Sequence, residues 1–332
     1  MKALVTGGGG FLGKRLVELL LSEGHDVRYL ARNIYPDVEA TGASGYQADV
    51  RNAKSLVAPL RDVDSVFHVA AKAGAWGPRA EYHDINVAGT ANLLQAARNA
   101  GVRSFIHTST PSVVSYRRDI ENGGQDLPYA RRHAAHYSAT KARAEQMVLQ
   151  ADAPGFRTVA LRPHLIFGPG DPHLLPRFIT GAMQGRLRII GNGTNSVDFT
   201  YIDNAAWAHI DAATSLAHAD PECAGRAYFI TNGEPVKLWP WFNNLLERLD
   251  LPPVRDSLSH RLAKPLFTAI EFAHRILPLG EPLVTGFLAD ALARGHWFDP
   301  EPARRDLGYE PRISMEDALI PTVDDLRMRF PA

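Results

Sequence analysis

Residues 3–13 of this chain read ALVTGGGGFLG, an apolar run that leads directly into a run of glycines. The residues that follow, 14–22, repeat Leu16, Leu19 and Leu20 at helical spacing. A short buried strand, a glycine turn and a helix, in this order, form the first unit of a Rossmann βαβ fold. We therefore predict an α/β protein built on a doubly wound parallel sheet.

Three of these glycines have the spacing of a phosphate-binding loop. Gly7 permits the tight turn, Gly10 lets the backbone approach a pyrophosphate, and Gly13 allows the helix to pack closely on the strand. The backbone N–H groups at the start of the helix point toward the phosphates. The loop predicts a dinucleotide site formed by Gly7, Gly10, Phe11, Leu12 and Gly13.

The end of the next predicted strand, residues 27–30, bears on the choice of dinucleotide. NAD-binding proteins usually carry an acid about 20 residues past the glycines, where it accepts hydrogen bonds from the ribose 2′-OH. Here Ala31 and Arg32 stand at that point. A guanidinium can pair bidentately with a 2′-phosphate, which an acid would repel. We predict NADP(H) rather than NAD(H), with Arg32 at the phosphate; the alternative is a solvated surface arginine.

A tyrosine and a lysine at helical spacing predict the chemistry. Tyr137 and Lys141 lie four residues apart and so share a helix face. A free phenol has a pKa of about 10, and a nearby ammonium lowers it. Thr110, with Ser109 as the alternative, follows a predicted strand and supplies a hydroxyl that polarises a carbonyl. The set predicts hydride and proton transfer at a carbonyl or carbinol carbon, with Lys141 also bridging the ribose hydroxyls of the nicotinamide.

Other strand ends are expected to complete the cofactor site. Asp49, beside Val50 at the end of a predicted strand, accepts a hydrogen bond from the adenine amino group or caps a helix over 52–60. Ala70 and Ala71, which end a strand over 65–71, leave room for a nucleotide to lie over the backbone.

Two further residues have one functional and one structural interpretation each. Asn86 begins a predicted long helix, where it holds a water or a kink behind Lys141 or is simply a buried polar residue. Pro163 follows a predicted strand over 157–161 and is expected to pack on the nicotinamide, or else only ends the strand.

These stretches together resemble the extended short-chain dehydrogenase/reductase superfamily over nearly the whole chain. RPHLIFGPGD at 162–171 and YIDNAA at 201–206 resemble its 3β-hydroxysteroid dehydrogenase branch. Within the branch, the chain is similar to bacterial reductases of 2-alkyl-3-keto acids in long-chain olefin biosynthesis, at residues 70–77, 108–113, 228–235 and 301–309. Thr110 departs from the serine of many superfamily members; it keeps the hydroxyl and narrows the pocket.

The resemblance implies an NADP-dependent reductase that converts the keto group of a long-chain 2-alkyl 3-keto acid to the 3-hydroxy acid. Its substrate would be an apolar carboxylic acid or a sterol-like molecule. A sterol 4-carboxylate 3-dehydrogenase is the nearest alternative, because it acts on the same β-hydroxy acid unit. A 3β-hydroxysteroid dehydrogenase/isomerase would need an added proton-shuttling acid. Substrate contacts are implied at Trp76, Ser112, His164 and Tyr201.

Two readings outside this branch are disfavoured. A nucleotide-sugar epimerase fits less well, because Arg32 suits NADP and not a retained NAD. A nucleotide sensor without turnover is disfavoured by the intact set of Thr110, Tyr137 and Lys141.

The chain is expected to divide near residue 170. Residues 1–170 are predicted to form the NADP-binding Rossmann domain with the catalytic residues, and 171–332 a smaller α+β substrate domain with segments that return to the first. A helix over 261–277 carries Leu262, Leu266, Phe267 and Ile270 with three cations. This stripe faces the core, forms a lid over an apolar substrate, or contacts a membrane or partner protein.

Composition excludes several classes of protein. The 36 basic and 36 acidic residues balance, which argues against nucleic acid as the main partner. The single cysteine, Cys223, excludes an intrachain disulfide, and His133 and His136 lack a third ligand, so we predict no metal site. Arg131 and Arg132 are interpreted as solvated. We expect a cytoplasmic protein, with a homodimer as its candidate assembly and with pathway enzymes or a membrane surface as candidate partners of 261–277.

Overall fold

The computed structural model describes residues 1–74, 76–114, 118–277, 280–282 and 284–331. Its centre is a seven-stranded parallel sheet in the order β12-β7-β5-β4-β1-β2-β3. The order reverses between β1 and β4, where Rossmann folds bind their ligands. The strands are β1 (Lys2–Thr6), β2 (Asp26–Ala31), β3 (Ser44–Gln47), β4 (Ser65–His68), β5 (Ser104–Thr108), β7 (Arg157–Pro163) and β12 (Arg226–Ile230). The predicted fold class is confirmed.

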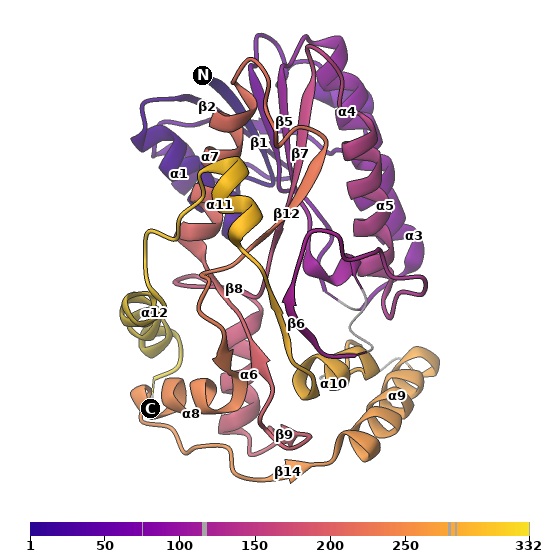
Figure 1. Cartoon of the computed structure of the whole chain (residues 1–332), viewed down its shortest axis with the longest axis vertical. Helices are drawn as coiled ribbons and strands as arrows, with labels where there is room; N and C mark the ends of the chain where they lie inside the picture. Colours follow the sequence, from indigo (N-terminus) through magenta and orange to yellow (C-terminus); the bar gives the residue numbers. More distant parts are fainter. Residues whose placement is uncertain (75, 115–117, 278–279, 283, 332) are drawn as a thin grey trace.

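Helices cover both faces of this sheet (Figure 1). On one face lie α1 (Phe11–Ser22) and α7 (Ile202–Leu216), with α11 (Glu301–Leu307) packed on α7. On the other lie α4 (Gly89–Asn99) and α5 (His136–Gln150). Successive strand residues alternate between the two layers, so Val5 belongs to the core under α1 and Leu4 to the core under α4. Burial on both faces explains why the strand centres, such as Ala3–Val5 and Val159–Leu161, are apolar.

A smaller part of the fold lies beyond the carboxyl ends of these strands (Figure 1). Its four-stranded sheet has the order β13 (Val236–Lys237), β10 (Ser196–Val197), β15 (His296–Phe298) and β6 (Ile120–Gly123). Two strand pairs join β8 (Ile166–Phe167) to β11 (Thr200–Tyr201) and β9 (Ile189–Ile190) to β14 (Ser257–Leu258). Its helices are α6 (Leu174–Met183), α8 (Leu238–Arg248), α9 (His260–Ile276), α10 (Gly286–Ala293) and α12 (Met315–Arg329).

Short helical segments connect the larger elements. They are α2 (Pro36–Glu39), α3 (Arg79–Tyr82), the 3₁₀ turns η1 (Ala53–Leu56) and η3 (Pro111–Val113), and the π-helical η2 (His83–Ala88). The helix expected over 52–60 is therefore only the turn η1, and the one expected from Asn86 begins in η2.

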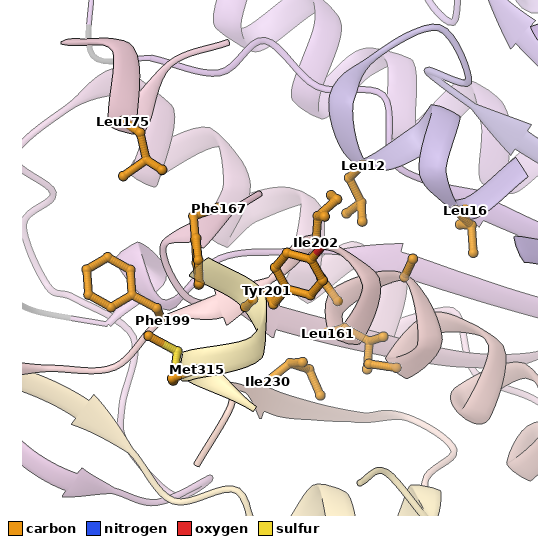
Figure 2. Packing of buried hydrophobic residues seen from close by; sticks show 14 of the residues in the cluster. Leu12, Leu16, Leu161, Phe167, Leu175, Phe199, Tyr201, Ile202, Ile230 and Met315 are labelled. Atoms are coloured by element: carbon orange, nitrogen blue, oxygen red, sulfur yellow. The ribbon is translucent and has the colours of Figure 1, made fainter. Parts of the chain in front are cut away.

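One apolar cluster joins the two parts of the fold. Figure 2 shows Leu12 and Leu16 of α1 near Leu161 of β7, and Phe167, Tyr201 and Met315 in the same cluster. Chain segments also cross residue 170 in both directions, because β12 lies in the large sheet and β6 in the small one. Continuous packing thus holds the large sheet against the smaller part of the fold.

Helix α9 distributes its apolar residues over two faces. Phe267 is 9% exposed and packs in the main core beside α10, and Ile270 is half-buried. Leu262 and Leu266 are 63% and 50% exposed. Further along the helix and just beyond its end, Phe272, Ile276 and Leu277 are also exposed. The four residues of the predicted stripe therefore do not share one environment: Phe267 belongs to the core, as the first of the three interpretations predicts, and Leu262 and Leu266 lie outside it.

The exposed apolar residues of α9 remain candidates for a contact with a membrane or a partner protein. Exposed apolar patches of this kind are typical of contacts with lipid or with another protein. The side chain of Arg275, one of the three cations noted beside the stripe, lies outside the described residues. No helix in the described part of the chain is long and apolar enough to cross a bilayer.

Phe267→Ser should lower the free energy of unfolding by about 3–5 kcal/mol, because it removes a large side chain from a packed core. Leu266→Ser, one residue away and half exposed, is the matched control and should cost less than about 1 kcal/mol. Urea denaturation of both variants measures the difference. Equal effects would show that Phe267 does not belong to the core.

Candidate active site

The hydroxyl, phenol and ammonium that the sequence predicts to be catalytic lie at the carboxyl end of β5. Thr110 follows β5, and its side-chain oxygen accepts a hydrogen bond from the Ser112 backbone N–H at 3.3 Å. The same Thr110 hydroxyl donates to Ser112 Oγ at 3.2 Å and interacts with the Tyr137 phenol. Ser109 is only 4% exposed, and its hydroxyl has no partner among the described residues. Contact with Tyr137 favours Thr110 over Ser109 for the carbonyl-polarising role.

Burial sets the protonation of Tyr137 and Lys141. It raises the pKa of the Tyr137 phenol, and the Thr110 hydrogen bond only partly opposes this rise. Burial also lowers the pKa of Lys141 to about 7, with Glu145 acting in the opposite sense. The expectation that Lys141 lowers the pKa of Tyr137 is not met here, because desolvation dominates. A raised phenol pKa keeps Tyr137 protonated at neutral pH, as a proton donor requires.

Lys141 lies in a buried polar setting that sequence reasoning missed. Its Nζ donates to the Thr108 carbonyl at 2.5 Å and lies 3.3 Å from His107 Nε2. Burial holds the pKa of His107 well below its ordinary value, so the imidazole is neutral and can accept from the ammonium. His68 and His209, with pKa values lowered to about 3 and about 4 by burial, are neutral as well. Three histidines near one cation therefore add no competing positive charge.

A buried ion pair fixes the catalytic helix to the sheet. Glu145, one turn beyond Lys141 on α5, accepts two hydrogen bonds from Arg162 of β7, at 2.6 and 3.0 Å. The two side chains are 0% and 4% exposed. Tyr129 donates to the same carboxylate at 2.6 Å, and the guanidinium lies over the Phe229 ring. Arg162 thus belongs to the scaffold, and Pro163 beside it ends β7 in register with Ile230 of β12.

Breaking this pair from one side should be costly. Arg162→Met leaves the Glu145 carboxylate buried without its cation, and we expect a loss of about 3–5 kcal/mol in the free energy of unfolding. The double variant Glu145→Gln/Arg162→Met should recover part of that loss. The surface pair Arg103–Asp64 provides the control, since Arg103 is 73% exposed and Arg103→Met should cost about 1 kcal/mol or less. A similar small loss for Arg162→Met would contradict the anchoring role.

The glycine loop has the shape that a pyrophosphate requires. Gly7 has φ of +72°, and a Cβ there would lie 3.0 Å from the backbone of Ala70. A Cβ on Gly13 would lie 2.1 Å from the Gly7 carbonyl oxygen. Gly10 is the N-cap of α1 and gives no side-chain cap, so the first N–H groups, at Phe11 and Leu12, meet no side-chain acceptor. These residues fit a dinucleotide phosphate at the helix N-terminus.

The ends of β2 and β3 meet beside this loop. Arg32 is exposed at the end of β2 and forms no ion pair within the described chain. The Asp49 carboxylate is held by Arg51 at 2.6 Å, which keeps its pKa low. Asn52, not Asp49, caps the η1 turn, so the capping interpretation of Asp49 is wrong. The Val50 side chain is buried in the core, which leaves only its backbone available to a cofactor.

Asn86 fixes the backbone loop that follows β4 by hydrogen bonds. This buried amide accepts from the Lys72 N–H at 2.7 Å and donates to the Lys72 carbonyl at 3.1 Å. It also donates to Thr140 Oγ1, at 3.0 Å, on the catalytic helix. Asn86 therefore supports the loop that follows Ala70 and Ala71 and has no contact with Lys141 in this structure.

A cavity of about 570 Å³ borders the catalytic group. Ser112, the partner of Thr110, and Ser138, the neighbour of Tyr137, line its inner end. Its other described walls are Val114, the loop before α5 (Ala130, Arg132, His133, Ala134), α9 (Lys264, Thr268, Glu271, Phe272) and α10 (Gly286, Phe287, Asp290). The side of α9 that faces the cavity is mostly polar. The residues of the loop before α5 and of α10 that line the cavity carry no motif that would have identified them from sequence.

Two of the four predicted substrate residues lie elsewhere. His164 is 3% exposed; its Nδ1 bonds to Asp198 and its Nε2 lies 3.1 Å from His296 Nδ1. Tyr201 is 4% exposed and packs on Phe167 in the core. Neither side chain lines the cavity, because both are used in packing.

The other two lie nearer the site. Ser112 lines the cavity, and Trp76 contacts the His274 ring of α9 at 6.4 Å between centroids. Ala75 precedes Trp76 in the stretch 70–77, which resembles the keto-acid reductases, and it lies outside the described residues. No group of three or more His, Cys, Asp or Glu in the described chain is arranged to hold a metal ion.

Comparison with known proteins places this site in a family. The model described as "3-beta hydroxysteroid dehydrogenase/isomerase family" matches residues 4–259. A Stenotrophomonas maltophilia (strain K279a) protein named 2-alkyl-3-oxoalkanoate reductase is 46% identical over 322 residues, 96% of this chain and 97% of that one. Its namesake in Shewanella oneidensis is 41% identical and covers 96% and 84%. The mouse sterol-4-alpha-carboxylate 3-dehydrogenase, decarboxylating, is 34% identical and covers 97% and 90%.

Solved structures agree with the fold. The crystal structure of gox2253 superposes with a TM-score of 0.80 at 25% identity, covering 98% of each chain. MoeE5, in complex with UDP-glucose and NAD, gives 0.75 at 25% identity and covers 99% of each.

Fold and site together define a nicotinamide-dependent oxidoreductase that acts on CH–OH or C=O groups. The chain belongs to the 3-beta hydroxysteroid dehydrogenase/isomerase family.

Proposed function

We propose that this chain is an NADP-dependent reductase of the keto group of long-chain 2-alkyl 3-keto acids. The observation that carries the proposal is the similarity to two 2-alkyl-3-oxoalkanoate reductases over 96% of the chain. The grouping of Thr110, Tyr137 and Lys141 beside a cavity of about 570 Å³ supports it.

The proposed reaction uses each of the three side chains once. The bound nicotinamide supplies the hydride to the carbonyl carbon. Thr110 donates a hydrogen bond to the carbonyl oxygen, and Tyr137 gives that oxygen its phenolic proton. Lys141 stabilises the phenolate that remains; its charge is present below a pKa of about 7 and is lost as the pH rises through that value.

A sterol 4-carboxylate 3-dehydrogenase is the second candidate, because the mouse enzyme of that name is 34% identical over 97% of this chain. Both activities act at a carbon β to a carboxyl group. The two activities differ in the bulk of the substrate, so a comparison of turnover on both substrate classes is the direct test.

A panel of 2-alkyl 3-keto acids, sterol 4-carboxylates and 3β-hydroxysteroids should distinguish the candidates. We expect NADPH oxidation with the 3-keto acids and no reduction of NADP⁺ with the hydroxysterols, both measured by nicotinamide absorbance. Turnover of sterols alone would reject the proposed substrate.

Tyr137→Phe should keep its melting temperature and NADPH affinity but lose about 10²–10⁴-fold in kcat, since it lacks the donated proton. A Tyr137→Phe rate above about a tenth of wild type would reject Tyr137 as the proton donor.

Arg32 should select the phosphorylated cofactor. It stands exposed without an ion pair in the described chain, at the place where NAD-binding proteins carry an acid. Arg32→Ala should weaken NADPH binding roughly tenfold or more, because a charge-assisted hydrogen bond contributes about 1.5–3 kcal/mol. NADH binding should change little, and titration calorimetry with both cofactors measures the ratio. An equal loss of affinity for NADPH and NADH would contradict the assignment of Arg32 to the 2′-phosphate.

A further inference from the structure

The charged side chains that line the cavity differ in whether they have a partner. Asp290 of α10 is paired with Lys264 and His260 of α9, each at 2.8 Å. Glu271 accepts a hydrogen bond from the Gly286 N–H at 3.2 Å. Each of these groups therefore already has a partner within the cavity wall. They hold α9 and α10 together and leave little capacity for a charged ligand.

Arg132 is the exception. It lines the same cavity from the loop before α5, and no carboxylate of the described chain pairs with it. Arg132 is exposed, as predicted for a solvated arginine, and it also lines the cavity, so it is placed to act on what enters. Its five N–H donors match the two oxygens of a carboxylate.

Two neutral groups nearby also have unused hydrogen-bonding capacity. Ser112 Oγ lies 3.2 Å from Thr110 Oγ1 and lines the cavity, where its hydroxyl can donate to an acceptor. His133 Nδ1 is buried without a partner in the described chain, and burial lowers the pKa of this imidazole, so it adds no charge. The free hydrogen-bonding capacity of the cavity therefore lies on the side of the catalytic residues.

We propose that Arg132 binds the carboxylate of the substrate, and that this contact makes the enzyme select β-keto acids over plain ketones. The inference rests on the proposed function. In a 3-keto acid one carbon separates the carboxyl carbon from the reacting carbon, so ordinary bond lengths place them only about 2.5 Å apart. The carboxylate must therefore lie at the catalytic end of the cavity. Arg132 and Ser112 are the donors that face it, while Phe272 and Phe287 line a path for alkyl chains.

The experiment compares two substrates that differ only in the carboxylate. One is a 2-alkyl 3-hydroxy acid, and the other is the secondary alcohol of the same chain; both are oxidised with NADP⁺ and are stable, whereas 3-keto acids lose carbon dioxide. Wild type, Arg132→Gln, Arg132→Lys and the control Arg131→Gln are assayed for kcat/KM on each. Arg131 is the adjacent arginine, exposed like Arg132, and does not line the cavity.

Arg132→Gln should lower the acid-to-alcohol ratio of kcat/KM by roughly ten- to a hundredfold, mainly through KM for the acid. Arg132→Lys should recover part of the preference, and Arg131→Gln should keep it. An unchanged ratio in Arg132→Gln overturns the assignment of Arg132. A wild type that prefers the alcohol overturns the proposed keto-acid function itself, and the two failures are thereby distinguished.

Discussion

The pair between Glu145 and Arg162 is the constraint on which the catalytic geometry depends. Both side chains are almost completely buried, and the contact is bidentate. Removing either charge would leave the other desolvated, so the pair holds helix and strand in one register. Glu145 lies one turn from Lys141, which lies one turn from Tyr137. A shift of α5 against β7 would move the phenol, the ammonium and the cavity wall together.

The same burial that requires this pairing tunes the reactive groups. Desolvation makes the charged form of each group less favourable, so the phenol holds its proton and the ammonium releases its own more readily. Glu145 limits the second effect by favouring the charged form of Lys141. The surrounding histidines are neutral because they are buried too. The structural pair and the chemistry of the site are therefore linked through one carboxylate.

Local patterns predicted the Rossmann fold and the shape of its glycine loop well, for a physical reason. Gly7 and Gly13 mark positions where any side chain would collide with backbone, and such constraints are visible in a single short stretch. Periodicity likewise predicted the parallel sheet. The substrate half was predicted poorly, because burial there depends on long-range packing. His164 and Tyr201 follow strands just as functional residues do, yet both face inward. Arg132 lies in a loop without a motif, so only the folded chain identifies it.

Helix α9 explains why an amphipathic pattern alone could not locate the substrate. Its apolar arc is wider than the contact that α10 offers, so part of it, including Leu262 and Leu266, remains exposed. The polar side, with Lys264 and Glu271, faces the cavity; Lys264 pairs there with Asp290 of α10, and Glu271 accepts a hydrogen bond from the Gly286 N–H. Recognition of the reacting end of the substrate is thus separated from the outward apolar face. Selectivity for the carboxylate can change at the loop before α5 without disturbing the packing of α9 on α10, since that packing involves Phe267 and not Arg132.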